Sequence, residues 1–281
     1  MDLRKFSKSA LILWLLILGS SCTKVIKVDL NSASPNIVVD AEVTDQAGPY
    51  TFNLTKTVNF SDDNVFPALS GAAVVLSDNA GNSETLTEIN PGNYVTSHIQ
   101  GIIGRTYNLS ITANGKNYTA TSTMPAGVPL DSVVADTTSP HRSFGFGGNN
   151  SSTTTSTAVT IRAVFTDPKG VANYYRLIEF VNGVGNYSSI NVISDQGQDG
   201  ALITETVVRR DTSLHAGDLV NIVLESIDVN VYEYFRTFKQ VTRAQTGIQV
   251  TVPGNPTTNL SNNALGFFSA HALRSMYVIV P

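Results

Sequence analysis

Hydrophobic and polar positions alternate with a period of two along most of residues 32–128. From Ile37 to Thr44 the odd positions are apolar and most even positions are polar. A strand that buries one face and exposes the other has this pattern. Tyr50, Phe52 and Leu54 continue it. Short strands punctuated by turns roughly every 8–12 residues predict a β-sandwich for this part of the chain.

One hairpin is expected within this region. Two alternating segments, residues 107–113 and 116–124, are separated by Asn114 and Gly115. These two residue types accept positive φ at both central positions of a type I′ turn, whose twist matches that of the strands it joins. The sequence therefore predicts two adjacent antiparallel strands here.

A second series of strand patterns begins at Pro129 and is interrupted by residues 137–158, which are rich in Ser, Thr and Gly. Such a segment cannot bury enough apolar area to offset the entropy of ordering it, so we expect a mobile loop. Strand patterns resume at residues 159–165 and 174–181. Residues 129–281 are therefore predicted to form a second β-rich domain.

One segment of this domain has a helical pattern. Asp228 is a suitable N-cap for a helix near residues 229–243, with Val231, Phe235 and Phe238 on one stripe. We expect this helix to pack on the core at one end of a sandwich. The predicted fold is mainly β, with two β-sandwich-like domains of Ig or transthyretin type at residues 35–128 and 129–281, the second with one short helix.

The N-terminal segment has the features of an export signal. Arg4, Lys5 and Lys8 precede an unbroken apolar run at residues 10–18, and small residues follow it. The run is shorter than the roughly 20 apolar residues that span a bilayer. Residues 1–21 are therefore predicted to be a signal peptide that is removed.

Cys22, the only cysteine of the chain, directly follows this segment. A lone thiol in an oxidising compartment has no intramolecular disulfide partner. The position is similar to that of the acylated cysteine in bacterial lipoprotein signals, so we expect Cys22 to carry lipid and residues 22–34 to form a tether. Gly19 departs from the leucine usual three positions before that cysteine, and ordinary signal cleavage at the same bond is the alternative.

Charge limits the partners that the protein can have. Residues 1–21 hold three of the 18 Lys and Arg residues and one of the 22 Asp and Glu residues, so their removal changes the formal charge from −4 to about −6. An acidic chain has no electrostatic basis for binding nucleic acid or anionic lipid headgroups. We therefore expect no nucleic-acid partner, and membrane attachment only through the N-terminal lipid.

No pattern of catalytic or metal-ligating residues stands out. His98, His141, His215 and His271 are widely scattered, without a His-Glu-x-x-His pair. His271 lies in a predicted strand, where we prefer the interpretation of a partly buried structural histidine over a functional one. No catalytic residue, cofactor or metal ligand is predicted. A catalytic pair of carboxylates stays open, because such a pair is defined in space.

Two acidic turns, residues 78–82 and 195–200, are also compatible with Ca²⁺ loops. Neither has ligands at positions 1, 3, 5 and 12 of an EF-hand loop. Asp, Asn and Gly are common residues of hairpin turns, so the turn interpretation is preferred. Whether either turn binds calcium stays open.

Several short segments resemble one family when they are taken together in this order. They are CTKVIKVDL (22–30), LTEINPGNYVT (86–96), GRTYNLSI (104–111), STMP (122–125), PLDSV (129–133), FTDPKGVANYYRL (165–177), SIDVNVYEYFR (226–236) and NPTTNLSNNALGFFSAHAL (255–273). The chain resembles the domain-of-unknown-function family 4249. The resemblance implies a cell-envelope lipoprotein of Bacteroidota-type bacteria, without an established activity, and a role beside TonB-dependent outer-membrane transporters.

These observations favour a lipid-anchored outer-membrane protein that binds a ligand or partner without catalysis. Sandwich domains present loops and surfaces for recognition without catalytic residues. The expected role is an accessory module for TonB-dependent nutrient uptake or for surface recognition. A structural or assembly protein of the envelope is the first alternative, and an envelope hydrolase is the second.

Overall fold

The structure, a computed structural model, describes residues 35–59, 63, 65–138, 158–244 and 254–281. Within these residues the chain is mainly β with one helix, α2 (Val229–Ala244), which confirms the predicted fold class. Residues Pro35–Pro281 form one compact unit. The predicted signal peptide, Cys22 and the tether lie outside the described residues, as do residues 139–157 of the expected loop.

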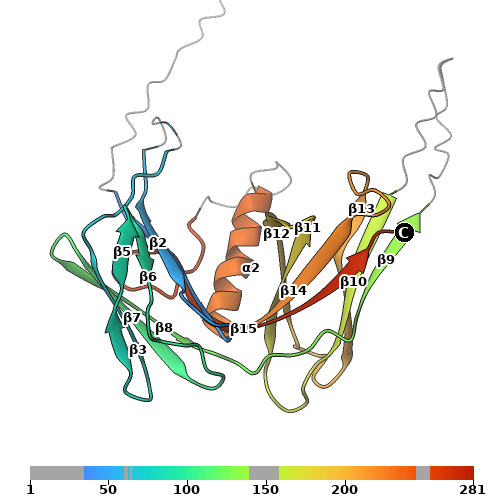
Figure 1. Ribbon diagram of the computed structural model, residues 1–281, viewed down its shortest axis with the longest axis horizontal. Coiled ribbons are helices and arrows are strands. Elements are labelled where there is room, and N and C mark those ends of the chain that lie inside the picture. Colours follow the sequence, from blue (N-terminus) through green and yellow to red (C-terminus); the bar gives the residue numbers. More distant parts are fainter. Residues whose placement is uncertain (1–34, 60–62, 64, 139–157, 245–253) are drawn as a thin grey trace, which may run out of the picture. The chain divides into compact units, whose positions relative to one another are not determined.

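Within the part of the chain that the structure describes, the strands form three sheets, whose arrangement is shown in Figure 1. The large sheet has eight strands in the order β12 (Val184–Ser194), β11 (Tyr174–Val181), β14 (Leu219–Ile227), β15 (Leu265–Ile279), β1 (Ile37–Thr44), β2 (Thr51–Lys56), β6 (Asn93–Val95) and β5 (Thr87–Asn90). The four-stranded sheet has the order β4 (Ser83–Thr85), β3 (Ala73–Asp78), β7 (Thr106–Ala113) and β8 (Lys116–Thr123). The three-stranded sheet has the order β13 (Leu202–Asp211), β10 (Ala158–Thr166) and β9 (Ser132–Thr138).

A parallel pair, β1 and β15, joins the two halves of the large sheet. Glu42 is the register partner of Ser269, and Thr44 is the partner of His271. On its other edge, β15 pairs antiparallel with β14. Strands from residues 35–128 and from residues 129–281 therefore share one sheet, a relationship that the predicted division of the chain does not include.

Two hydrophobic cores lie on one face of the large sheet. In the first core, Phe52 of β2 packs with Leu109 of β7 and Phe268 of β15. In the second core, Phe165 of β10 packs with Tyr175 of β11, and their ring centroids are 4.9 Å apart. Each small sheet thus covers one half of the large sheet, and the sandwich-like prediction holds for both halves.

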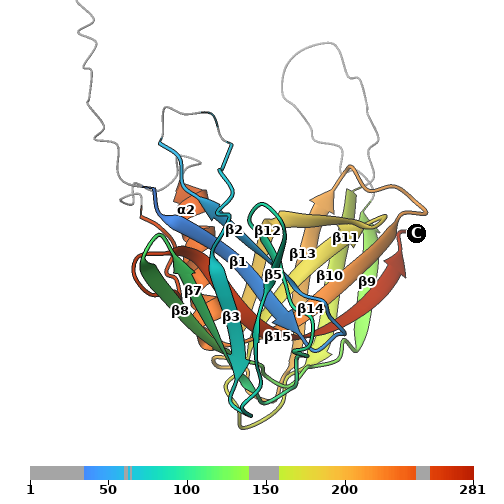
Figure 2. The same ribbon diagram turned by 60° about the vertical axis from the view of Figure 1, so that its left-hand side comes forward.

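Strand β15 contributes to both cores because it is 15 residues long. Phe268 and Ala270 near its start belong to the first core, whereas Met276 and Val278 near its end pack against the second. Figure 2 shows β15 beside β1 and continuing toward the C-terminal end of the chain. The last strand thereby makes the two cores depend on one continuous element.

Helix α2 packs on the opposite face of the large sheet, where it contacts β11, β12 and β15. Its buried residues Val231 and Phe235 pack with Phe267 of β15 and Ile227 of β14. Oδ1 of Asp228 accepts hydrogen bonds from the backbone N–H groups of Asn230 (2.9 Å) and Val231 (3.0 Å). The predicted N-cap and apolar stripe are therefore confirmed.

The predicted hairpin is β7 and β8, which pair antiparallel from Thr106–Thr123 to Ala113–Lys116. Asn114 has φ of 52° and Gly115 has φ of 73°, as a type I′ turn requires. Local turn chemistry was sufficient to predict this element.

Candidate functional site

A group of charged side chains lies on the α2 face of the large sheet. We call Glu42, Arg176, Glu225 and His271 the charged cluster; they come from the adjacent strands β1, β11, β14 and β15. Alternation places them there, because Ala41 on β1 and Ala270 on β15 belong to the core on the other face. Neither sandwich core lies on this face, so the small sheets leave it to α2 and solvent.

Arg176 connects the two carboxylates of the charged cluster. It is the register partner of Glu225, and its Nη1 lies 3.2 Å from Oε2 of Glu225 and 3.6 Å from Oε1 of Glu42. Arg176 is 8% exposed and Glu225 is 3% exposed. Each of two buried charges of opposite sign at this distance is stabilised by the other, because water cannot solvate either one if its partner is lost.

His271 is the most deeply buried member of the charged cluster, with 1% of its surface exposed. Nδ1 lies 2.9 Å from Oγ of Ser269, and Nε2 lies 3.7 Å from Oε1 of Glu225. Among the described residues, Nε2 has no hydrogen-bond partner. The sequence predicted a partly buried histidine in a strand, and the structure places it in β15, fully enclosed and facing a carboxylate.

Aromatic residues of α2 form one wall of the charged cluster. The guanidinium carbon of Arg176 lies 4.0 Å from the ring centroid of Phe235, a distance suited to cation–π attraction. Tyr234 packs against Phe267 with ring centroids 4.9 Å apart. Burial is the main cause that raises the pKa of Tyr234, followed by the charge of Asp40.

Asp40 and Glu42 extend the charged cluster toward solvent along β1. Asp40 is exposed and Glu42 is half-buried, yet nearby protein atoms crowd both carboxyl groups. Desolvation is the largest cause that raises the pKa of Asp40, and the charge of Glu42 adds to it. Desolvation also raises the pKa of Glu42, against the opposing effects of His271 and Arg176. Three carboxylates and one guanidinium leave this region with excess negative charge.

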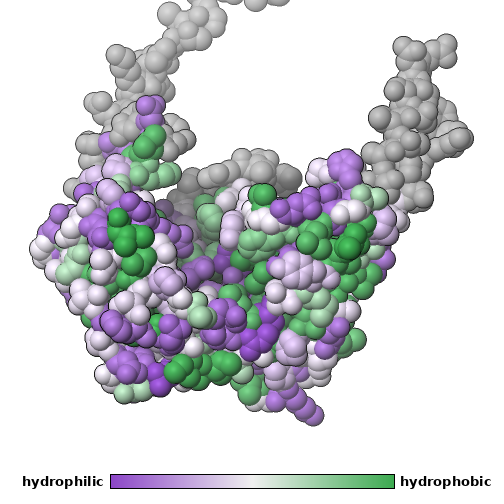
Figure 3. Space-filling view, viewed as in Figure 1, coloured by the Kyte–Doolittle hydropathy of each residue, from purple (hydrophilic) through white to green (hydrophobic). Residues whose placement is uncertain are grey.

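The surface beside β1 on the α2 face is polar. Thr51 and Asn53 of β2 are exposed there, while Phe52 between them is buried in the first core. Figure 3 shows a hollow in this view of the molecule with hydrophilic residues at its floor. The face therefore offers fixed charged groups below and adaptable polar groups at its edge, a suitable arrangement for binding.

Sequence analysis missed the charged cluster because its members are far apart in the chain. A signal was nevertheless present: Arg176 lies within the apolar strand pattern of residues 174–181, and Glu225 directly follows the apolar residues 222–224. A charge within such a run must find a partner in the folded protein. The sequence alone does not say which charge supplies it.

A second group of carboxylates forms at the turn that was compatible with calcium. Asp195 and Asp199 of this turn lie close to Asp167, so that one carboxylate oxygen from each lies within 4.8 Å of the others. Backbone N–H groups already engage them: Gly200 donates to Asp167 (3.0 Å), and Gly170 donates to Asp199 (2.6 Å). Residues 195–200 form turns, as preferred from the sequence.

The other acidic turn is saturated by protein donors. Asp78 accepts hydrogen bonds from the backbone N–H groups of Ala80 and Asn82, each at 2.9 Å, and from Nη1 of Arg105 at 2.6 Å. These donors outweigh the effect of burial and lower the pKa of Asp78. This carboxylate serves the turn and is not directed at a ligand.

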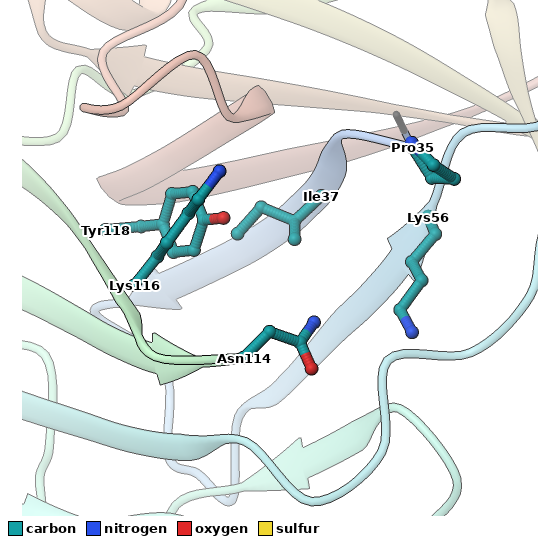
Figure 4. A pocket seen from close by; sticks show the side chains of 6 residues that line it. All are labelled: Pro35, Ile37, Lys56, Asn114, Lys116 and Tyr118. Carbon is teal, nitrogen blue, oxygen red and sulfur yellow. The ribbon is translucent and has the colours of Figure 1, made fainter. Parts of the chain in front are cut away.

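A pocket of about 260 Å³ lies at one end of the first sandwich (Figure 4). Its lining residues are Pro35, Ile37, Lys56, Asn114, Lys116 and Tyr118. Asn114 and Lys116 belong to the exposed β7–β8 turn region, so the polar groups here are surface side chains. The charged cluster is the stronger candidate site because burial and ion pairs fix its groups in place.

Comparison with protein families places the chain. The model of the domain of unknown function DUF4249 matches residues 23–275, so this protein belongs to that family. No curated protein matches the chain. Within the described ranges, no helix is long and apolar enough to cross a membrane.

The site predicted from the sequence, Cys22, lies outside the described residues, and its acylation stays a prediction. His98 and His215 are exposed at the surface beside Glu84 and Asp218, far less buried than His271. His141 lies in the segment that is not described. The structure thus singles out His271 among the histidines that it describes.

Proposed function

We propose that this protein is a lipid-anchored lipoprotein of the outer membrane of Bacteroidota-type bacteria. It binds a ligand or partner without catalysis, as an accessory to a TonB-dependent transporter. The observation that carries the binding role is the charged cluster with its polar edge, on the one face of the large sheet that neither small sheet covers. The anchoring role rests on Cys22 behind its apolar segment.

The anchor would hold the binding face near the membrane. Residues 23–34 reach about 40 Å at most, at roughly 3.3 Å per extended residue. A domain confined to that distance meets membrane-embedded partners at high effective concentration, and a modest interface is then sufficient for binding. Three acyl chains would anchor the protein far more durably than one.

The side chains of the α2 face are suited to binding a partner. Burial and their ion pair hold Glu225 and Arg176 in place. Binding of a ligand would therefore lose little conformational entropy at these two side chains. Asp40, Thr51 and Asn53 are accessible beside them. A partner that offers cationic or hydrogen-bonding groups fits this surface.

A site-specific photo-crosslinking amino acid tests the proposal in living cells. It replaces Thr51, which is exposed on the α2 face, and in the control it replaces Lys116, which is exposed on β8. We expect the Thr51 position to crosslink to a TonB-dependent transporter, and both the Lys116 control and the Cys22→Ala background to lose that product.

The opposite result defines the alternative. If neither position crosslinks to a transporter and deletion of the gene leaves nutrient uptake unchanged, the uptake role is wrong. Crosslinks only to envelope scaffold proteins would favour a structural or assembly role.

A further inference from the structure

His271 presents a buried nitrogen that nothing satisfies. Its side chain is 1% exposed, and Nε2 has no hydrogen bond among the described residues. A buried polar atom that loses water without gaining a partner is costly, and native proteins keep few of them. The Nε2 atom faces Oε1 of Glu225 at 3.7 Å, which is too long for a hydrogen bond.

Two carboxylates converge on the same point. Glu42, Glu225 and His271 each offer one ligand atom, and all three atoms lie within 4.8 Å of one another. In tetrahedral zinc sites, bonds of about 2.0–2.1 Å place ligand atoms about 3.4 Å apart. The His271–Glu225 distance of 3.7 Å is close to that value, and Glu42, half-buried and 3.6 Å from Nη1 of Arg176, is the third member.

We propose that Glu42, Glu225 and His271 bind one divalent transition metal ion, with Zn²⁺ as the reference ion. An imidazole with two carboxylates suits zinc and its neighbours better than calcium or magnesium, which prefer oxygen ligands alone. Glu42 is the ligand in contact with solvent, so the remaining coordination position opens on its side. The site does not depend on the lipid anchor or on a transporter.

The residues behind the three ligands are arranged as supports. Ser269 lies 2.9 Å from Nδ1 of His271, where a hydrogen bond fixes the ring and leaves Nε2 for the metal. Arg176 holds Oε2 of Glu225, and the other oxygen, Oε1, is the one that faces His271. Outer partners of this kind orient ligands in established metal sites.

Charge balance favours a divalent ion at this position. Asp40, Glu42 and Glu225 place three carboxylates here, and the groups that oppose them are the guanidinium of Arg176 and, for Glu42, also the imidazole of His271. An imidazole that binds a metal does so in its neutral form, so three carboxylates and one guanidinium leave two negative charges for a divalent cation to neutralise. Nη1 of Arg176 lies 3.2 Å from Oε2 of Glu225 and 3.6 Å from Oε1 of Glu42, whereas His271 faces the other oxygen of Glu225, Oε1.

Zinc titration of the full chain, purified in mild detergent and stripped with a chelator, tests the proposal. Competition with a chromophoric chelator should give one Zn²⁺ per chain. His271→Gln should weaken binding by more than about 100-fold, beyond the 10–100-fold typical of losing an outer partner. His98→Gln removes an exposed histidine beside Glu84 and should bind as the unchanged protein does.

A second variant keeps the test decisive if His271→Gln does not fold. Glu42→Gln changes a half-buried residue with nearly the same shape, and its fold can be checked by circular dichroism. Zn²⁺ should raise the melting temperature of the unchanged protein but not that of this variant. The proposal is wrong if no stoichiometric zinc binds, if Glu42→Gln binds zinc unchanged, or if His98→Gln abolishes binding.

Discussion

Arg176 and Glu225 face each other across β11 and β14 as register partners, with Nη1 of Arg176 3.2 Å from Oε2 of Glu225. Both side chains are buried on the α2 face, and Phe235 of α2 covers the guanidinium. The helix, the two strands and the candidate site are therefore coupled through one ion pair.

Removing one partner of this pair should be more harmful than removing both. Arg176→Met leaves Glu225 as a buried charge facing Glu42 and should lower the free energy of unfolding by about 3–5 kcal/mol. The double variant Arg176→Met/Glu225→Leu should recover a large part of that loss, because the buried charge of Glu225 is removed as well and half-buried Glu42 keeps contact with solvent. Chemical denaturation of both variants measures the difference. If the double variant loses as much free energy of unfolding as Arg176→Met, or more, the coupling is absent.

Gly266 is predicted to be essential for the junction between β1 and β15. It has φ of +88°, and an added Cβ would lie 1.9 Å from the backbone oxygen of Val39. Gly266→Ala must therefore separate the parallel pair as well as strain the backbone. We expect a loss of stability above about 3 kcal/mol, the range of severe core disruption, or failure to fold.

The matched control for this prediction is Gly104→Ala. Gly104 has φ of +83°, but nothing lies within 4 Å of an added Cβ. Gly104→Ala should therefore lower the free energy of unfolding only through backbone strain at positive φ, by about 1–2 kcal/mol. Similar unfolding curves for the two variants would show that the close approach of β15 to β1 does not limit stability.

Asp78 should contribute stability that depends on pH. Burial alone would raise its pKa, but hydrogen bonds from Asn82, Ala80 and Arg105 outweigh burial and lower it. Because the folded-state pKa lies below the unfolded value of about 3.9, the stabilisation is complete above that value and is lost as pH falls through the folded-state pKa. Asp78→Asn should cost about 1–3 kcal/mol at pH 7 and clearly less at pH 3.

Asp136→Asn provides the comparison for that measurement. Asp136 pairs with Arg162, and each side chain is 42% exposed, so water screens the pair. Its removal should change stability by less than about 1 kcal/mol. Denaturation at pH 7 and pH 3 distinguishes the two variants. An Asp78→Asn loss that is the same at both pH values would contradict the role of the charged carboxylate.

The sequence predicted local structure well and long-range pairing poorly. Three predictions are confirmed, and each rests on a sequence signal that spans only a few neighbouring residues. They are the strand at residues 37–44, the Asn114-Gly115 turn and the Asp228 cap. Alternation also separates the two faces of a strand, but it does not say which strands pair. The parallel pairing of β1 with β15 brings together residues more than 220 positions apart, and no local pattern encodes it.

The candidate site was unpredictable for the same reason. Glu42, Arg176, Glu225 and His271 form a cluster only because β11, β14, β15 and β1 are neighbours in the large sheet. His271 attracted attention in the sequence, but its burial and the carboxylates around it depend on that strand order. The sequence offered only the general signal of charges within apolar strands.

Lipid anchoring is the central claim of the proposed function, and metabolic labelling with a palmitate analogue tests it most directly. Cells that express the unchanged chain should yield a labelled protein in the membrane fraction. Cys22→Ala removes the only cysteine and should yield an unlabelled protein that leaves that fraction. Equal labelling and equal membrane association of the two proteins would contradict the account.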